Sequence, residues 1–124
     1  MKSVIAAALF VLLSGCASLP SPQEAATADY GPMPTNYEEI VKNYYGNTLK
    51  DPYSVQYQNI SFPRQSWLGD RFTGAKYGYL VCATLNAKNS YGAYVGYKTD
   101  GLLIHGNSVI LYVPDGMWFG RQVC

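Results

Sequence analysis

The run over residues 76–87 constrains the fold more than any other part of the chain. Its centre, YLVCATL, carries apolar side chains at consecutive positions and is rich in residues that favour strands. Successive side chains of a strand point to opposite faces, so a strand with this sequence has two apolar faces. Both faces then need a cover, as in the interior of a layered fold. We therefore predict that residues 76–87 form a central, covered strand.

Shorter strand-type segments flank this central run. A loop is expected over residues 63–75, and Lys88-Asn89-Ser90 is expected to connect the central strand to the next one. The His-Gly-Asn sequence at residues 105–107 is typical of a tight hairpin turn. The further strands are predicted at residues 55–62, 91–104 and 109–113.

Residues 36–50 carry the clearest helical pattern. Their apolar side chains recur at i, i+3, i+4, i+7 and i+8, which places them on one face of a helix. A capping box, formed by Thr35 with Glu38 or by Asn36 with Glu39, would begin this helix. We therefore expect an α+β fold, in which one N-terminal amphipathic helix packs on a three- to four-stranded antiparallel meander sheet. A partner-binding role for the same helix face stays open.

The first 15 residues have the character of a secretory signal. Lys2 supplies a positive charge, an apolar run follows it, and small residues close the segment. The apolar run is far shorter than the roughly 20 residues that a membrane-spanning helix needs. We therefore expect a cleaved signal rather than a transmembrane anchor.

The signal ends in Leu13-Ser14-Gly15-Cys16, which resembles the lipobox of bacterial lipoproteins. The resemblance implies that the Cys16 thiol is lipidated, that the peptide is cut just before Cys16, and that the new amine is acylated. Ala17, rather than Asp, follows the cysteine, and in this class that implies an outer-membrane protein on the periplasmic face. A plain signal peptide in which Cys16 is incidental is the alternative.

On this interpretation the chain has three parts. Residues 1–15 are the lipoprotein signal peptide, residues 16–34 are the lipidated Cys16 with a disordered Pro-rich tether, and residues 35–124 are a small α+β domain. The tether is predicted because residues 17–34 contain four prolines and few side chains that could bury apolar surface. A coil of this length would hold the domain clear of the lipid headgroups.

The cysteines predict one disulfide. With Cys16 taken by lipid, Cys82 and Cys124 are left, and two cysteines allow one pairing in an oxidising compartment. The Cys82–Cys124 bond would join the last residue to the middle of the domain. Two free thiols or a redox pair are the alternatives, although the spacing is not Cys-x-x-Cys.

The composition argues against nucleic acid as a partner. Nine Lys and Arg side chains oppose eight Asp and Glu side chains, and no basic stripe is present. Twelve Tyr and twelve Gly in a chain poor in charge suit a small β-rich domain. We therefore expect no nucleic-acid partner, and the lipobox resemblance implies a membrane attachment through lipid and a partner in the cell envelope.

A second resemblance begins within the central run and has its core at Asn86-Ala87-Lys88-Asn89-Ser90-Tyr91-Gly92. This sequence is similar to an Asn-Ala-Lys-Asn-Ser-aromatic-Gly block in small uncharacterised secreted proteins and lipoproteins of Gram-negative bacteria. The sequence LKDPYSVQY at residues 49–57 resembles the element that precedes the block in those proteins. The resemblance extends over residues 37–113 and implies a shared domain, but it implies no activity.

Amide, hydroxyl, ammonium and aromatic side chains gather at the expected hairpin tip. Amide donors beside aromatic faces can bind a polar polymer, a sugar chain or a peptide strand. The alternative is that the Asn and Ser side chains cap their own turn and that the tyrosines pack on the sheet. The candidate binding surface consists of Asn86, Lys88, Asn89, Ser90, Tyr91 and Tyr94.

The sequence offers no pattern typical of a catalytic, metal or cofactor site. His105 is the only histidine and lies in an expected turn, so neither a cluster of metal ligands nor a Ser-His-Asp triad can be assembled. We therefore expect no enzyme activity, no bound metal and no cofactor. Convergence of Asp70, Asp100 or Asp115 in a deep pocket would reopen the question.

Together these features predict a non-enzymatic outer-membrane lipoprotein that serves as a binding or accessory module of the cell envelope. Its partner would be an envelope protein or peptidoglycan. The alternative is an inhibitor or exclusion factor that acts against an incoming hydrolase, phage or conjugative element. A small tethered domain suits that task, but the sequence shows no inhibitory loop motif.

Lipidation of Cys16 is directly testable. Globomycin blocks lipoprotein processing, so it is expected to change the gel mobility of the protein because the signal peptide stays attached. Cys16→Ser is expected to yield a protein without acyl chains that keeps its signal peptide, as measured by mass spectrometry. Unchanged mobility in globomycin would contradict lipidation and favour the plain signal peptide.

Overall fold

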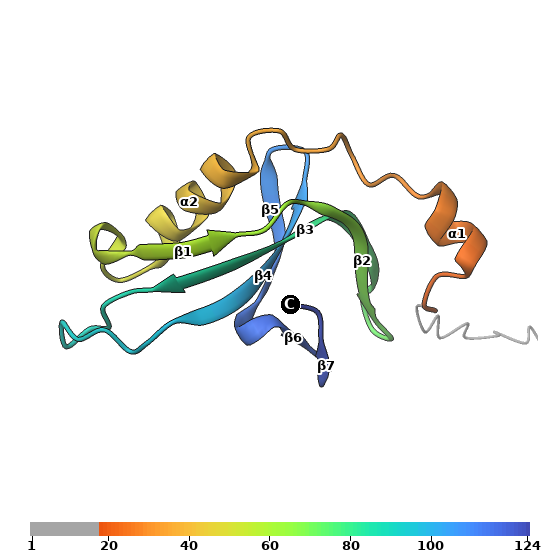
Figure 1. Cartoon of the computed structure of the whole chain (residues 1–124). Coiled ribbons are helices and arrows are strands. Elements are labelled where there is room, and N and C mark those ends of the chain that lie inside the picture. The colour runs from red at the N-terminus through yellow and green to blue at the C-terminus, as the bar shows by residue number, and fades with distance from the viewer. Residues whose placement is uncertain (1–17) are drawn as a thin grey trace, which may run out of the picture.

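Figure 1 shows the computed structural model of the chain, which describes residues 18–124. The predicted signal peptide and Cys16 lie outside the described residues. Within the described part, no helix is both long and apolar enough to cross a bilayer. The fold is α+β with an antiparallel sheet, which confirms the predicted fold class.

Five strands form the main sheet, and all of its pairs are antiparallel. β3 (Gly74–Asn86) pairs with β4 (Lys98–His105), which pairs with β5 (Ser108–Val113). β1 (Gln56–Ile60) and β2 (Arg64–Asp70) both pair with β3, β1 near its end and β2 along its first half. β1 and β2 therefore lie end to end along one edge of the long strand (Figure 1).

Two local predictions about the sheet are wrong. Residues 63–75 are predicted to form a loop, but they contain β2. The backbone of the long β3 forms ladder hydrogen bonds with this segment, and the local sequence pattern does not indicate that pairing. Residues 91–97, expected as a strand, belong to a loop in which Gly92 and Gly96 have φ of +76° and +103°. Because β1 and β2 share one edge of β3, the main sheet has five strands rather than the expected three or four.

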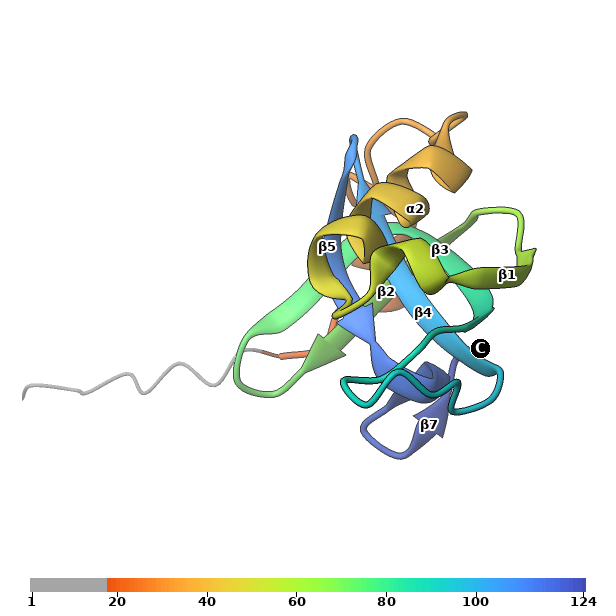
Figure 2. The same ribbon diagram turned by 90° about the vertical axis from the view of Figure 1, so that its left-hand side faces the viewer.

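α2 (Tyr37–Thr48) covers one face of the sheet (Figure 2). Asn36 is its N-cap but makes no side-chain cap hydrogen bond, so the alternative capping box with Glu39 is not formed in the described structure. Ile40, Val41 and Tyr45 are the buried residues of the helix, and they pack on alternate side chains of β3 and β4. These side chains belong to Val81, Ala83, Leu85, Leu102 and Ile104.

The C-terminal tail covers the opposite face. It contains η2 (Pro114–Gly116), β6 (Met117–Trp118) and β7 (Arg121–Gln122). Trp118 and Val123 pack there on a second buried cluster, so β3 has a cover on both faces and the prediction of a central, covered strand is confirmed. The second cluster consists of Leu68, Leu80, Leu103 and Val113.

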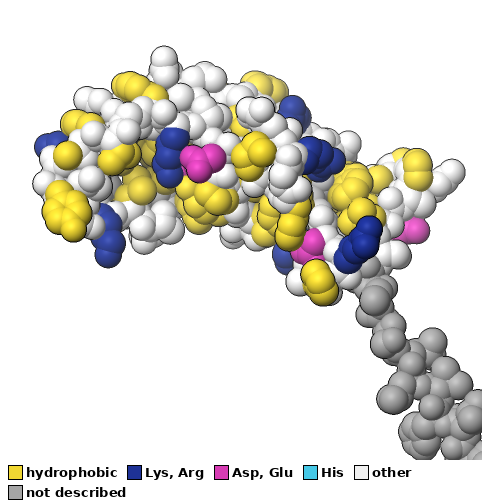
Figure 3. Space-filling model, turned by 90° about the horizontal axis from the view of Figure 1, so that it is seen from below, with side chains coloured by type: hydrophobic (Ala, Val, Ile, Leu, Met, Phe, Trp, Pro, Cys, Tyr) yellow, Lys and Arg dark blue, Asp and Glu magenta, His cyan; other side chains and the backbone are white. Residues whose placement is uncertain are grey.

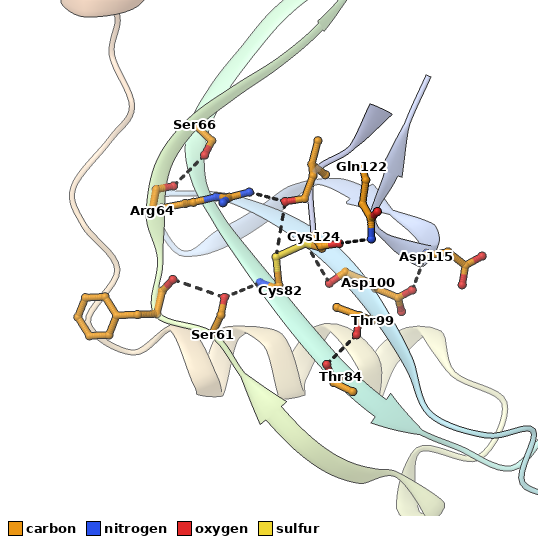
Figure 4. Close-up of a disulfide and its surroundings, with 12 residues drawn as sticks. Ser61, Arg64, Ser66, Cys82, Thr84, Thr99, Asp100, Asp115, Gln122 and Cys124 are labelled. Atoms are coloured by element: carbon orange, nitrogen blue, oxygen red, sulfur yellow. Dashed lines mark hydrogen bonds between the residues drawn. A yellow bond between two sulfur atoms is a disulfide. The ribbon is translucent and has the colours of Figure 1, made fainter. Parts of the chain in front are cut away.

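The Cys82–Cys124 disulfide is formed and joins this tail to β3 (Figure 4). Gly116 gives it room, because its φ is +66° and a Cβ added there would lie 2.6 Å from the Cβ of Cys124. Gly101 on β4 also faces the bridge, and a Cβ there would lie 3.2 Å from the Cys124 sulfur. The path of the tail over the sheet therefore depends on glycine at position 116.

Part of the predicted tether is ordered. α1 (Pro22–Thr27) begins after Ser21, whose side chain accepts a hydrogen bond from the Glu24 amide. Tyr30 is buried, its hydroxyl donates to the Ala25 carbonyl at 2.6 Å, and its ring lies 5.4 Å from that of Tyr77 on β3. Pro22 occupies a helix start, a position that tolerates proline, so proline content alone does not indicate disorder here. Ordered structure therefore begins before residue 35.

Loss of the disulfide is expected to lower stability because the unfolded chain becomes less constrained. Closing a separation of 42 residues contributes about 4 kcal/mol in the chain-entropy view. Cys82→Ala/Cys124→Ala is therefore expected to lower the free energy of urea unfolding by up to that amount, measured by circular dichroism. Reduced wild type should behave like the variant. A variant as stable as the oxidised wild type would contradict this role for the bridge.

Candidate functional site

The predicted binding residues lie in and beside the longest connection of the sheet, residues 87–97 between β3 and β4. We call this segment the β3–β4 loop. In Figure 1 it lies at the left end of the molecule, far from α1. Figure 3 shows hydrophobic side chains next to Lys and Arg side chains at that end. The structure therefore brings the candidate residues together at one extremity of the domain.

Asn89 shapes the tip of the loop through its side-chain carbonyl. Its Oδ1 accepts hydrogen bonds from the amides of Tyr91 at 2.9 Å and Ala93 at 3.2 Å. The backbone amide of Asn89 donates to the Ala93 carbonyl at 2.9 Å, and Gly92 adopts the left-handed conformation that the turn needs. For Asn89 the structure favours the interpretation in which the side chain caps its own turn.

Asn86 holds the base of the loop. It is the last residue of β3, only 9% of its surface is exposed, and its Oδ1 accepts a hydrogen bond from the Gly96 amide at 3.1 Å. This bond joins the two ends of the loop across ten residues. Asn86 is thus a structural support, and it is not part of an exposed surface.

Ser54 connects the loop to the segment that follows α2, and sequence reasoning did not single it out. It lies in η1 (Pro52–Ser54), and its Oγ accepts from the Lys88 amide at 3.0 Å. The Tyr94 hydroxyl donates to the Ser54 carbonyl at 2.7 Å. The signal that could have found Ser54 is the LKDPYSVQY element, which accompanies the Asn-Ala-Lys-Asn block in the resemblance described above.

The side chains left free for a partner are mainly aromatic and cationic. Tyr91 is 95% exposed and Tyr53, on η1, is 99% exposed. The Lys88 ammonium lies 5.5 Å from the centre of the Tyr94 ring, in a cation–π contact that orients both groups. Ser90 is exposed beside them. The exposed set differs from the predicted one by the gain of Tyr53 and the loss of Asn86, while Asn89 is exposed but uses its Oδ1 within the loop.

A shallow groove of about 230 Å³ runs between the end of α2 and the loop. Its lining combines three lysines with apolar residues from β3 and the loop and with the polar Asn89 and Ser90. A site with this lining suits a polar ligand that carries negative charge and also offers a flat or apolar face. The groove is lined by Leu49, Lys50, Leu85, Ala87, Lys88, Asn89, Ser90, Val95, Gly96 and Lys98.

Of Asp70, Asp100 and Asp115, only Asp100 is buried. Its side chain has no exposed surface, and its Oδ2 accepts from the Tyr45 and Tyr112 hydroxyls, each at 2.8 Å. Its Oδ1 accepts from the Asp115 amide at 2.9 Å, and the Lys98 ammonium lies 3.5 Å from Oδ2. Burial first, and then the hydrogen bond to Asp100, raises the pKa of both tyrosines.

The Asp70 carboxylate and the His105 ring form hydrogen bonds with groups other than Asp100. Asp70 lies at the β2–β3 turn, where hydrogen bonds from Thr73 and the Phe72 amide lower its pKa. The His105 Nδ1 pairs with the Tyr77 carbonyl at 2.8 Å. Among residues 18–124, no group of three His, Cys, Asp or Glu side chains is placed to hold a metal ion. The three aspartates therefore do not converge in one pocket.

Comparison with protein-family models, curated proteins and solved structures found no match to this chain. The two resemblances described from the sequence stay predictions. Assignment of the site therefore depends on its geometry, its exposed side chains and its position in the fold.

The buried hydrogen bonds from Tyr45 and Tyr112 to Asp100 predict a loss of stability at alkaline pH. Above pH 10, the ordinary tyrosine pKa, Tyr45 ionises in the unfolded chain but keeps its proton in the folded chain. The unfolded state then binds fewer protons, so the free energy of unfolding falls as pH rises, by up to about 1.4 kcal/mol per pH unit for this group. Urea unfolding between pH 8 and about 11 measures the slope.

Tyr45→Phe is expected to reduce this alkaline slope by the contribution of one titrating group, up to about 1.4 kcal/mol per pH unit. It should also lower stability at neutral pH by about 1 kcal/mol, because Asp100 loses a donor. Tyr53→Phe is the matched control, since Tyr53 is 99% exposed and should leave the slope intact. An identical alkaline slope in wild type and Tyr45→Phe would show that Tyr45 does not resist ionisation in the folded state.

Proposed function

We propose that this protein is a non-enzymatic, outer-membrane-anchored lipoprotein that binds peptidoglycan through the exposed face of its β3–β4 loop. The observation that carries the proposal is the hydrogen-bonded loop, which exposes the Tyr91 ring and is joined through its Lys88 amide to η1, the element that carries the exposed Tyr53. The anchor is the predicted lipid on Cys16. The periplasmic face of the outer membrane is the expected location.

The loop is organised before any partner binds. Asn86, Asn89 and Ser54 together fix its base, its tip and its contact with η1. A segment that is already in its binding conformation loses little conformational entropy on association. The hydrogen-bonded side chains therefore support binding indirectly, and the exposed tyrosines and lysines make the contacts.

The chemistry of the exposed face favours a glycan chain that carries carboxylates. Tyrosine rings provide flat faces on which a sugar ring can pack, and their hydroxyls can bond to sugar hydroxyls. Lys50 and Lys88 line the groove and can pair with carboxylates of peptidoglycan stems, whereas the Lys98 ammonium already lies beside Asp100. This combination of aromatic and cationic groups supports peptidoglycan over an uncharged polymer.

The position of the loop also supports this function. The described chain begins near α1, and Figure 1 shows that the β3–β4 loop lies at the opposite end of the domain. Cys16 precedes the first described residue by only two positions. A lipid on Cys16 would therefore put the membrane at one end and leave the loop free to reach the layer beyond.

Co-sedimentation with purified peptidoglycan sacculi tests the proposal. Lys88→Ala/Tyr91→Ala is expected to weaken binding at least about tenfold, because buried aromatic and cationic contacts dominate such interfaces. Lys76→Ala/Phe62→Ala is the matched control, since Lys76 and Phe62 are exposed but belong neither to the β3–β4 loop nor to the groove. Asn89→Ala is expected to weaken binding while the circular dichroism spectrum stays unchanged.

Two outcomes would contradict the proposed function. Sacculi that do not retain the wild-type protein would exclude peptidoglycan as the partner. Crosslinking in the native envelope that captures one protein, lost in Lys88→Ala/Tyr91→Ala, would assign the same surface to an envelope protein instead.

A further inference from the structure

A second exposed apolar surface lies at the other end of the domain. Leu19, Phe72 and Phe119 come from three distant parts of the chain and, with Arg71, line one hollow of about 290 Å³, to which Gly69 and Asp70 also contribute. We call the first four of these residues the apolar tip. Phe72 is 90% exposed, Phe119 is 74% exposed and Leu19 is 50% exposed. Figure 3 shows hydrophobic, basic and acidic side chains next to the beginning of the described chain.

The turn that carries Phe72 is held in shape by Asp70. The Asp70 Oδ1 accepts from the amides of Phe72 and Thr73, each at 2.7 Å, and its Oδ2 accepts from the Thr73 hydroxyl at 2.6 Å. These bonds leave the Phe72 ring in solvent on a defined backbone. The ring is thus presented by an ordered turn.

The second aromatic ring of the tip is held by the C-terminal hairpin. The Trp118 indole donates to the Gly69 carbonyl at 3.0 Å, which joins β6 to the end of β2. Phe119 follows with φ of +45°, a conformation that is unusual for a bulky residue. Phe119 and Gly120 form the two-residue turn between β6 and β7, and the Phe119 ring lies 5.0 Å from that of Trp118. The hairpin turn therefore presents a large apolar ring that stays mostly exposed, as contact surfaces do.

Leu19 connects the tip to the N-terminal part of the chain. A Cβ added at Gly69 would lie 3.2 Å from the Leu19 Cδ2, so the Leu19 side chain lies directly on the end of β2. Cys16 is three residues before Leu19, and an extended chain spans at most roughly 10 Å over that distance. Any acyl chains on Cys16 therefore enter the membrane beside the apolar tip.

We propose that the apolar tip docks into the lipid surface that holds Cys16, with the Phe72 and Phe119 rings among the upper acyl chains. The Arg71 guanidinium then lies at the level of the lipid phosphates. This inference rests on the proposed lipid anchor. It adds that the domain has a fixed orientation on the membrane, with the β3–β4 loop pointing away from it.

A tryptophan reporter tests this contact in the full lipidated protein. Phe72→Trp retains an aromatic side chain in the tip, and Phe62→Trp is the matched control at another exposed phenylalanine, 71% exposed. Each protein is reconstituted into phosphatidylethanolamine and phosphatidylglycerol vesicles whose acyl chains are brominated. The added emission at position 72 is expected to be blue-shifted and at least half quenched by bromine. Emission at position 62 is expected to match that in unbrominated vesicles.

Mass spectrometry of the same samples separates failure of the anchor from failure of the docking. Lipid on Cys16 with no bromine quenching at position 72 would overturn the docking and leave the anchor in place. A blue shift without bromine quenching would also overturn it, and would assign the tip to a protein contact or a second copy.

Absence of lipid would remove the proposed anchor. Quenching at position 72 by added vesicles would then still support the docking, and no quenching would overturn it.

Discussion

One buried carboxylate ties together the elements around the middle of β4. Asp100 accepts hydrogen bonds from Tyr45 on α2, from Tyr112 on β5 and from the Asp115 amide at the start of the tail. A buried carboxylate is costly unless its oxygens are fully bonded, so these contacts have to form together. The next residue, Gly101, lies against the Cys124 sulfur on the other face of the sheet. Two consecutive residues of β4 thus connect the helix cover and the tail cover.

The length of β3 determines where the two proposed contact surfaces lie. Its 13 residues extend over roughly 40 Å at the usual rise of a strand. The turn with Phe72 precedes its first residue, and the β3–β4 loop follows its last. One continuous strand, paired along both edges, therefore separates the apolar tip from the loop. A domain held by lipid at one end would present the loop at a defined height above the membrane.

The candidate site shows how far local sequence can be interpreted. Asn89 was recognised as a turn residue or a binding residue, and its hydrogen bonds to Tyr91 and Ala93 favour the first role. The role of Ser54 depends on a contact across 34 positions, which no local pattern encodes. The exposure of Tyr53 and the burial of Asn86 likewise depend on how η1 and the loop meet. The residue types at the site were predictable, but their division into supports and contacts was not.

The sequence by itself determined the central strand, the α+β class and the Cys82–Cys124 pair, because an apolar run of this length and two remaining cysteines each allow few solutions. Only the tertiary structure decided that residues 64–70 form a strand, since that segment pairs with β3 and lacks a strong apolar pattern of its own. It also decided that Tyr30 is buried and that Leu19, Phe72 and Phe119 meet at one tip. Such contacts join residues that are distant in the chain, and local propensity carries no information about them.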